Sequence, residues 1–151
     1  MKVPQVVLFA LDDWLGNQLR ELVNEHRWLL REARQLEAFA GQFAERRPSI
    51  AILQLDWRDV RSELAEVVVR LAREHPEIGI VAVIDTKIPE EHRSEWTAAL
   101  LDLGCCWVLY PPLTRAMLED LLSGWMTALT ERLRWPVAES AIDLASGSYE
   151  E

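Results

Sequence analysis

Five short apolar runs alternate along the chain with segments of helical periodicity. The runs cover residues 5–10, 28–33, 50–55, 79–84 and 105–110. They begin about every 22 to 29 residues, which is the length of a strand, a helix and their connecting loops. Three of the runs lack polar alternation, as strands do when helices cover both faces of a parallel sheet. The pattern therefore predicts five parallel strands, each followed by a helix.

The segments between the runs carry apolar stripes spaced three and four residues apart, as on the buried side of a helix. The residues of these stripes are Leu15, Leu19, Leu22 and Val23; Leu36, Phe39, Ala40 and Phe43; Val60, Leu64, Val67, Val68 and Leu71; Trp96, Ala99, Leu100 and Leu103; and Leu118, Leu121, Leu122, Trp125 and Leu129. Five strand–helix units of this size predict an α/β protein with a three-layer (βα)5 flavodoxin-like fold, whose parallel sheet has the strand order 2-1-3-4-5.

We expect one domain over residues 1–133. Trp135-Pro136 breaks the last helix, so residues 134–151 are predicted to be a flexible acidic tail or a linker.

Composition narrows the class of protein. The 151 residues carry a net charge of −9, which argues against nucleic-acid binding because a duplex reader needs a basic face. No run approaches the roughly 20 apolar residues that span a bilayer, and the N-terminus has no signal-peptide pattern. Adjacent Cys105 and Cys106 are predicted to be reduced core thiols. These features predict a cytoplasmic protein that does not act at a membrane.

Several motifs, in their order and spacing, resemble the receiver domain of bacterial response regulators. Residues 28–33 resemble its second strand, residues 45–50 the approach to its third, and residues 73–78 the loop before its fourth. Residues 103–113, which end in Tyr110-Pro111-Pro112-Leu113, resemble the stretch that carries a Lys-Pro pair in active members. The resemblance runs from Val6 to about Leu129.

The resemblance also implies where the phosphorylation chemistry would lie. Active receivers use an aspartate at the end of strand three, an acidic pair after strand one, a hydroxyl after strand four and a lysine after strand five. The corresponding positions here are Gln54 for the aspartate, Ala10 and Leu11 for the acidic pair, Ile84 or Asp85 for the hydroxyl, and Pro111 for the lysine. Only Pro112 matches, so the resemblance implies a degenerate (pseudo-) receiver in two-component signalling that is not an enzyme, needs no cofactor and holds no metal.

Elementary chemistry supports the loss of phosphoryl transfer. Gln54 has no ionisable oxygen and cannot act as a carboxylate nucleophile. Without the acidic pair no metal offsets the phosphoryl charge, and without the lysine the anion loses a cationic partner.

Four nearby carboxylates leave an alternative open. Asp12 and Asp13 lie two residues beyond the positions of the expected acidic pair, and Asp56 lies two residues beyond Gln54. Asp85 is expected beside them. A two-residue slip keeps a side chain on the same face of a strand, so these groups could form a displaced acidic site centred on Asp56 as phosphoacceptor. The competing interpretation is that they cap helices.

Exposed aromatic and apolar side chains suggest a binding surface. In receiver-like folds the face made by helix 4, strand 5 and helix 5 contacts partners, and here it corresponds to residues 90–129. We expect a protein partner or a homodimer there, with Tyr110, Met117 and Trp125 as contacts. Trp14 and Trp57 follow strands one and three, and a third hypothesis is a small-molecule sensor that binds beside them.

Overall fold

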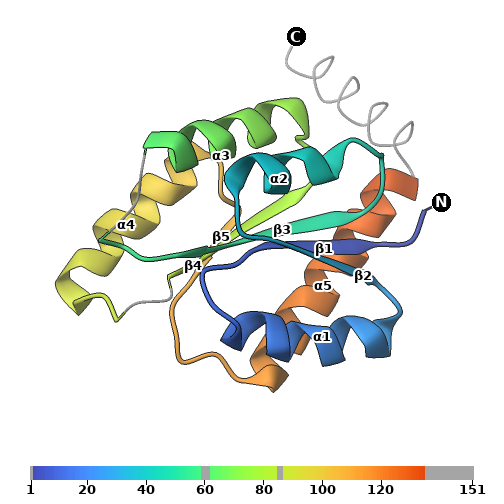
Figure 1. Cartoon of the computed structure of the whole chain (residues 1–151), viewed down its shortest axis with the longest axis horizontal. Coiled ribbons are helices and arrows are strands. Elements are labelled where there is room, and N and C mark those ends of the chain that lie inside the picture. Colours follow the sequence, from blue (N-terminus) through green and yellow to red (C-terminus); the bar gives the residue numbers. More distant parts are fainter. Residues whose placement is uncertain (1, 59–61, 85–86, 135–151) are drawn as a thin grey trace, which may run out of the picture.

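The computed structural model describes residues 2–58, 62–84 and 87–134, with the side chain of Ser62 left out. Asp85 and the predicted tail beyond residue 134 lie outside these ranges. The elements are β1 (Gln5–Phe9), α1 (Trp14–His26), β2 (Leu29–Ala33), α2 (Leu36–Ala40), the 3-10 turn η1 (Gly41–Phe43), β3 (Ser49–Leu55), α3 (Ser62–Glu74), β4 (Gly79–Ile84), α4 (Glu90–Leu103), β5 (Trp107–Leu109) and α5 (Arg115–Arg134). All paired strands are parallel, in the order β2-β1-β3-β4-β5 (Figure 1). The predicted three-layer (βα)5 flavodoxin-like fold is confirmed.

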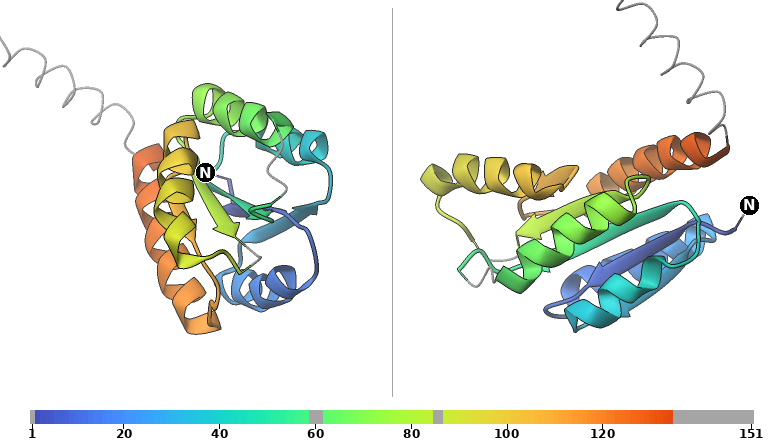
Figure 2. Two further views of the ribbon diagram at one scale, coloured as in Figure 1. Left: turned by 90° about the vertical axis from the view of Figure 1, so that its left-hand side faces the viewer. Right: turned by 90° about the horizontal axis from the view of Figure 1, so that it is seen from above.

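Alternation along the central strands builds two separate apolar cores. Val6 and Leu8 of β1 face α1 and α5, whereas Val7 packs with α2, α3 and α4 on the other side of the sheet. Both cores draw on the predicted helical stripes, and the three layers are visible in Figure 2. All seven residues of β3 are buried, because this strand is the middle one of five and helices cover both its faces.

Elements at the two edges of the sheet depart from the sequence pattern. β5 has three residues rather than the six expected, and α2 spans five residues before its stripe continues into the 3-10 turn. Cys105 is buried, and burial raises the pKa of its thiol to about 12. Cys106 is exposed, so the expectation that both cysteines lie in the core is wrong. An edge strand presents one side to solvent even within an apolar run.

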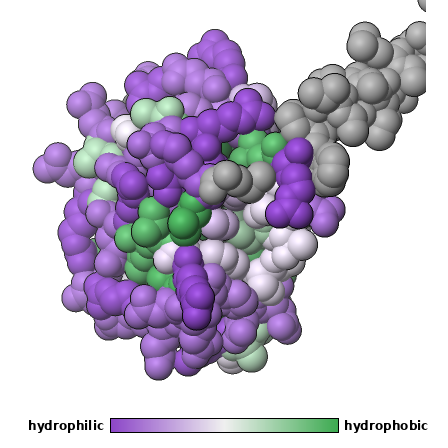
Figure 3. Space-filling model, turned by 90° about the vertical axis from the view of Figure 1, so that its right-hand side faces the viewer, coloured by the Kyte–Doolittle hydropathy of each residue, from purple (hydrophilic) through white to green (hydrophobic). Residues whose placement is uncertain are grey.

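The strands begin at the end of the molecule where the N-terminus lies, and their carboxyl ends point the opposite way (Figure 1). The end where the strands begin is largely hydrophilic, with apolar surface near its centre (Figure 3). Leu29, at the start of β2, is 39% exposed. None of the described helices combines the length and the apolar character needed to cross a bilayer.

Gly104 ends α4 with a positive φ, which glycine adopts at little cost. Its φ is 126°, and its N–H donates to the carbonyl oxygen of Leu101. An added Cβ would lie 2.6 Å from the Cβ of Ala72 on α3. The glycine therefore provides both the turn into β5 and the close approach of α3.

We predict that Gly104→Ala lowers the free energy of unfolding by about 2 kcal/mol, because the left-handed backbone and the contact with Ala72 both disfavour a side chain. Gly124→Ala is the matched control, since an added Cβ there meets no atom within 4 Å and Gly124 lies inside α5. The control should raise the free energy of unfolding by about 0.5–1 kcal/mol. Urea denaturation followed by circular dichroism measures both changes, and an equal effect of the two substitutions would contradict the role of Gly104.

Candidate functional site

Gln54 lies at the end of β3 with none of its surface exposed. Its side chain turns toward the loop between β1 and α1. There Gln54 Oε1 accepts hydrogen bonds from the backbone N–H groups of Leu11 and Asp12, at 2.8 and 3.5 Å. Its Nε2 donates to Asp12 Oδ1 at 2.9 Å. Both ends of this buried amide therefore have partners, as buried polar groups require.

Asp12 continues this connection into the first helix. Its Oδ1 also accepts a hydrogen bond from the backbone N–H of Trp14, the first residue of α1, at 3.3 Å. A side chain that accepts from the residue two positions ahead forms an Asx-type turn, which favours helix initiation. Asp13 occupies the N-cap position of α1 but makes no side-chain capping hydrogen bond, so Asp12 is the aspartate that supports the start of this helix, and the same carboxylate holds Gln54.

The two acidic-pair positions are occupied by apolar side chains in different environments. Ala10 is buried in the core beneath α1, and Leu11 is 44% exposed at the carboxyl end of the sheet. Ile84 is buried at the end of β4, and Pro111 is half-buried after β5. None of these side chains can hold a metal ion or an anion.

The structure describes three of the four carboxylates of the displaced site, and each of the three makes a different contact. Asp13 pairs with Arg34 at 2.6 Å, and Asp56 accepts from the backbone N–H and the guanidinium of Arg58. Asp12 contacts Gln54, and Asp85 lies outside the described residues. Over residues 2–58, 62–84 and 87–134 no group of three or more His, Cys, Asp or Glu side chains could hold a metal ion.

Sequence reasoning missed the role of Arg34. The spacing of the arginines in this region is typical of a solvent-exposed face. The side chain of Arg34 nevertheless extends from the end of β2 to the β1–α1 loop. Besides its ion pair with Asp13, it donates to the carbonyl oxygen of Leu11 at 3.3 Å. An arginine directly after a predicted strand that neighbours β1 was the available signal, since the carboxyl ends of paired parallel strands lie together.

The tryptophans that follow β1 and β3 are both half-buried. Trp14 packs against the core beneath α1 and α5, and Trp57 packs against the opposite core. The Trp57 ring also stacks on His92, with ring centroids 5.9 Å apart.

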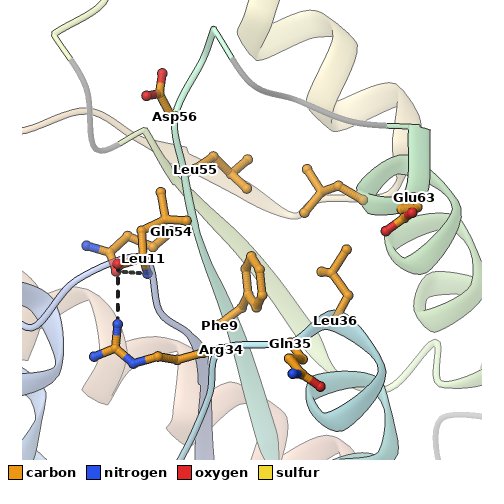
Figure 4. Close-up of a pocket in the computed structure, with 10 residues that line it drawn as sticks. Phe9, Leu11, Arg34, Gln35, Leu36, Gln54, Leu55, Asp56 and Glu63 are labelled. Carbon is orange, nitrogen blue, oxygen red and sulfur yellow. Dashed lines mark hydrogen bonds between the residues drawn. The ribbon is translucent and has the colours of Figure 1, made fainter.

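A pocket of about 400 Å³ opens at the same end of the sheet, on the side of α2 and α3 (Figure 4). It is lined by Phe9, Leu11, Arg34, Gln35, Leu36, Gln54, Leu55, Asp56, Glu63 and Leu64. Neither Trp14 nor Trp57 lines the pocket, so it differs from the sensor site suggested by the sequence.

The arrangement around Gln54 can hold a loop but offers no nucleophile. Its amide accepts from backbone N–H groups and donates to a carboxylate, which ties the β1–α1 loop to the central strand. The chemistry that a phosphoacceptor needs is a free carboxylate beside a bound cation. Gln54 supplies neither part of that chemistry.

Several solved receiver domains and response regulators share this architecture. The signal receiver domain of an HD domain-containing protein from Pseudomonas fluorescens Pf-5 aligns with a TM-score of 0.70 at 15% identity, over 89% of this chain and 95% of that one. An orphan response regulator of H. pylori gives 0.64 at 15% identity, over 81% and 95%. A CheY-like receiver domain from Methanospirillum hungatei JF-1 gives 0.67 at 9% identity, over 87% and 99%.

These likenesses show that the chain has the response-regulator receiver fold. No protein-family model matches the sequence, and no curated protein matches it. At identities this low the evidence concerns the fold, and the function has to be argued from the site.

We predict that Gln54→Glu destabilises the protein by about 1–3 kcal/mol at pH 7.5, because a buried carboxylate then faces the Asp12 carboxylate. Burial and the neighbouring charge raise the pKa of the introduced group above its unfolded value of about 4.3. The loss in free energy of unfolding is therefore complete above the raised pKa and disappears as the pH falls toward 4.

The matched control is Gln54→Met, which removes the hydrogen bonds without adding a charge. Its deficit relative to the unmodified protein should be similar at pH 7.5 and pH 4. Urea unfolding of the three proteins at both pH values measures these differences. A deficit of Gln54→Glu that does not shrink in acid would contradict the contact with Asp12.

Proposed function

We propose that this chain is a pseudo-receiver, a non-catalytic signalling module that acts in a bacterial cytoplasm through protein–protein contacts. The single observation that carries the proposal is the buried amide of Gln54, which fills the phosphoacceptor position and has hydrogen-bond partners at both ends. The receiver fold supports the signalling class, and the apolar side chains at Ala10, Leu11 and Pro111 support the loss of phosphoryl chemistry.

The alternative function is a phosphoacceptor with a displaced acidic site centred on Asp56. Asp56 is half-buried at the carboxyl end of the sheet, which favours this alternative, but Arg58 already pairs with its carboxylate. Asp12, which would have to share a cation with Asp56, is engaged with Gln54. The contacts therefore favour the pseudo-receiver.

The proposed contact surface lies where α4 and α5 flank the edge strand β5 (Figure 2). On α4, Thr97 Oγ1 lies 2.6 Å from Tyr110 Oη, at the end of β5. Leu101 follows Thr97 by one helical turn, so it shares that side of α4, and it is 45% exposed.

The same argument defines the side of α5 that borders β5. Trp125 stacks on Trp107 of β5, with ring centroids 4.0 Å apart and an interplanar angle of 16°. Leu121 and Met117 precede Trp125 at intervals of four residues and lie along the same side. Met117 is 44% exposed. We call Leu101, Tyr110, Met117, Leu121 and Trp125 the β5-edge surface.

The opposite side of α5 is occupied by contacts within the chain. Arg115 pairs with Glu21 and Glu25 of α1, and Glu119 lies 3.6 Å from His26. The β5-edge surface lies on the side of α5 away from these contacts, and it combines exposed apolar side chains with half-buried aromatic rings. Such surfaces favour association with another protein.

We predict that incubation with Mg²⁺ and acetyl phosphate leaves the protein unmodified, because Gln54 cannot accept a phosphoryl group. Intact-mass spectrometry measures the outcome, with an active receiver domain treated in parallel as the positive control. A phosphoryl adduct that Asp56→Asn abolishes would contradict the pseudo-receiver and support the displaced site. An adduct that survives Asp56→Asn would contradict both assignments.

We predict that a photocrosslinking amino acid at position 117 gives one discrete protein adduct in the source cells, whereas the same group at position 29 does not. Leu29 is the control because it is 39% exposed at the other edge of the sheet, on β2. Light scattering of the purified chain then distinguishes a homodimer from a different partner. If a complex forms that Met117→Arg leaves intact and Leu29→Arg disrupts, the β5-edge surface is the wrong interface.

A further inference from the structure

The pocket between β3, α2 and α3 is built mainly from apolar side chains. Its volume is about 400 Å³, which falls within the roughly 300–1,000 Å³ of small-molecule sites in proteins. Leu55 and Leu64 are buried, whereas Phe9 and Leu36 are half-buried and Leu11 is exposed. An apolar guest would therefore remove hydrocarbon surface from water on several sides at once.

Charged side chains stand around this apolar lining in Figure 4. The Arg34 guanidinium is neutralised by Asp13, and the Asp56 carboxylate is neutralised by Arg58. Glu63, in the first turn of α3, is exposed and has no ion pair or side-chain hydrogen bond to any residue that the structure describes. Among the described residues that line the pocket, the charge without an ion-pair partner is therefore negative.

The chemistry of an occupant follows from these two observations. An anionic guest would meet the Glu63 carboxylate and an arginine that is already paired. A purely apolar guest would fill the lining but would make no use of the exposed Glu63 carboxylate at its border. A compact hydrocarbon or aromatic body that carries one ammonium group satisfies both the lining and the carboxylate.

We propose that this pocket binds a small amphipathic organic cation, with its apolar body against Leu36, Leu55 and Leu64 and its ammonium group beside Glu63. The site goes beyond the proposed contact function and does not depend on it. It lies on the side of the sheet near β2, whereas the β5-edge surface lies at the opposite edge. Binding there gives a receiver-type fold an input that requires no phosphoryl transfer.

The test uses phenethylamine as the cationic probe, with 2-phenylethanol as the neutral counterpart and 3-phenylpropanoate as the anionic one. Because no tryptophan lines the pocket, methyl-labelled leucine NMR is the readout. We expect saturable shifts of the Leu36, Leu55 and Leu64 methyl signals with phenethylamine. The anion should bind severalfold more weakly, because one exposed charge pair changes affinity by up to about fivefold and the anion meets a like charge at Glu63 instead.

Two substitutions on α3 separate binding from helix stability, because a carboxylate in a first helical turn also interacts favourably with the helix dipole. Glu63→Gln should remove the preference for the amine over 2-phenylethanol. Glu66→Gln, on the same helix but outside this pocket, should leave the preference unchanged. Urea unfolding of both variants reports any effect on stability independently.

A third variant, Leu36→Trp, fills the pocket from a half-buried position and should weaken all three probes together. The proposal is overturned if no probe shifts these methyl signals, if 3-phenylpropanoate binds as well as phenethylamine, or if Glu63→Gln leaves the preference intact. These outcomes are independent of the phosphorylation assay, so failure here leaves the pseudo-receiver assignment untouched.

Discussion

The hydrogen bonds of Gln54 hold the carboxyl end of the sheet together. A neutral amide has one accepting and one donating end, and here they face a backbone N–H and the Asp12 carboxylate respectively. A carboxylate at the same position could accept from the N–H but would repel Asp12 without a cation between them. The amide therefore connects β3 to the β1–α1 loop with no metal ion.

This connection determines which surfaces of the molecule are open to a partner. Asp12 is engaged by Gln54, and Arg34 holds both Asp13 and the carbonyl oxygen of Leu11. The β1–α1 loop is thus tied to two neighbouring strands, β2 and β3. These internal contacts leave the β5-edge surface and the pocket beside α2 and α3 as the two surfaces that we propose for other molecules.

The fold was predictable because its signals are continuous along the chain. Residues 50–53 of β3 and all of β4 form continuous apolar runs, as strands covered on both faces do, and the stripe from Leu15 to Val23 matches the buried side of α1. The short β5 and the exposed Cys106 were not predictable, because an apolar sequence does not tell an edge strand from a central one.

The site was predictable only in part. The resemblance identified Gln54 as the position where the acceptor is missing, but spacing alone grouped Asp12 with Asp56. Which way a loop side chain turns depends on the partners that the fold brings to it, and those partners are far away in sequence. Asp12 lies 42 residues from Gln54, and Arg34 lies 21 residues from Asp13. No local pattern encodes the contact of Gln54 with Asp12, and the contact of Arg34 with Asp13 is indicated only through the pairing of β1 with β2.

The uncharged hydrogen-bonded connection made by Gln54 also limits how this fold can switch between conformations. In a phosphorylated receiver a new covalent charge changes the relative energies of two conformations, whereas a bound molecule shifts them only by the difference between its affinities for the two. A ligand with equal affinity for both states changes nothing, however tightly it binds. On the pseudo-receiver proposal, regulation of this chain would come from a molecule that prefers one arrangement of the β5-edge surface or of the pocket formed by β3, α2 and α3. Gln54 holds the β1–α1 loop through hydrogen bonds that do not involve the β5-edge surface, although Gln54 and Leu11 both line the pocket.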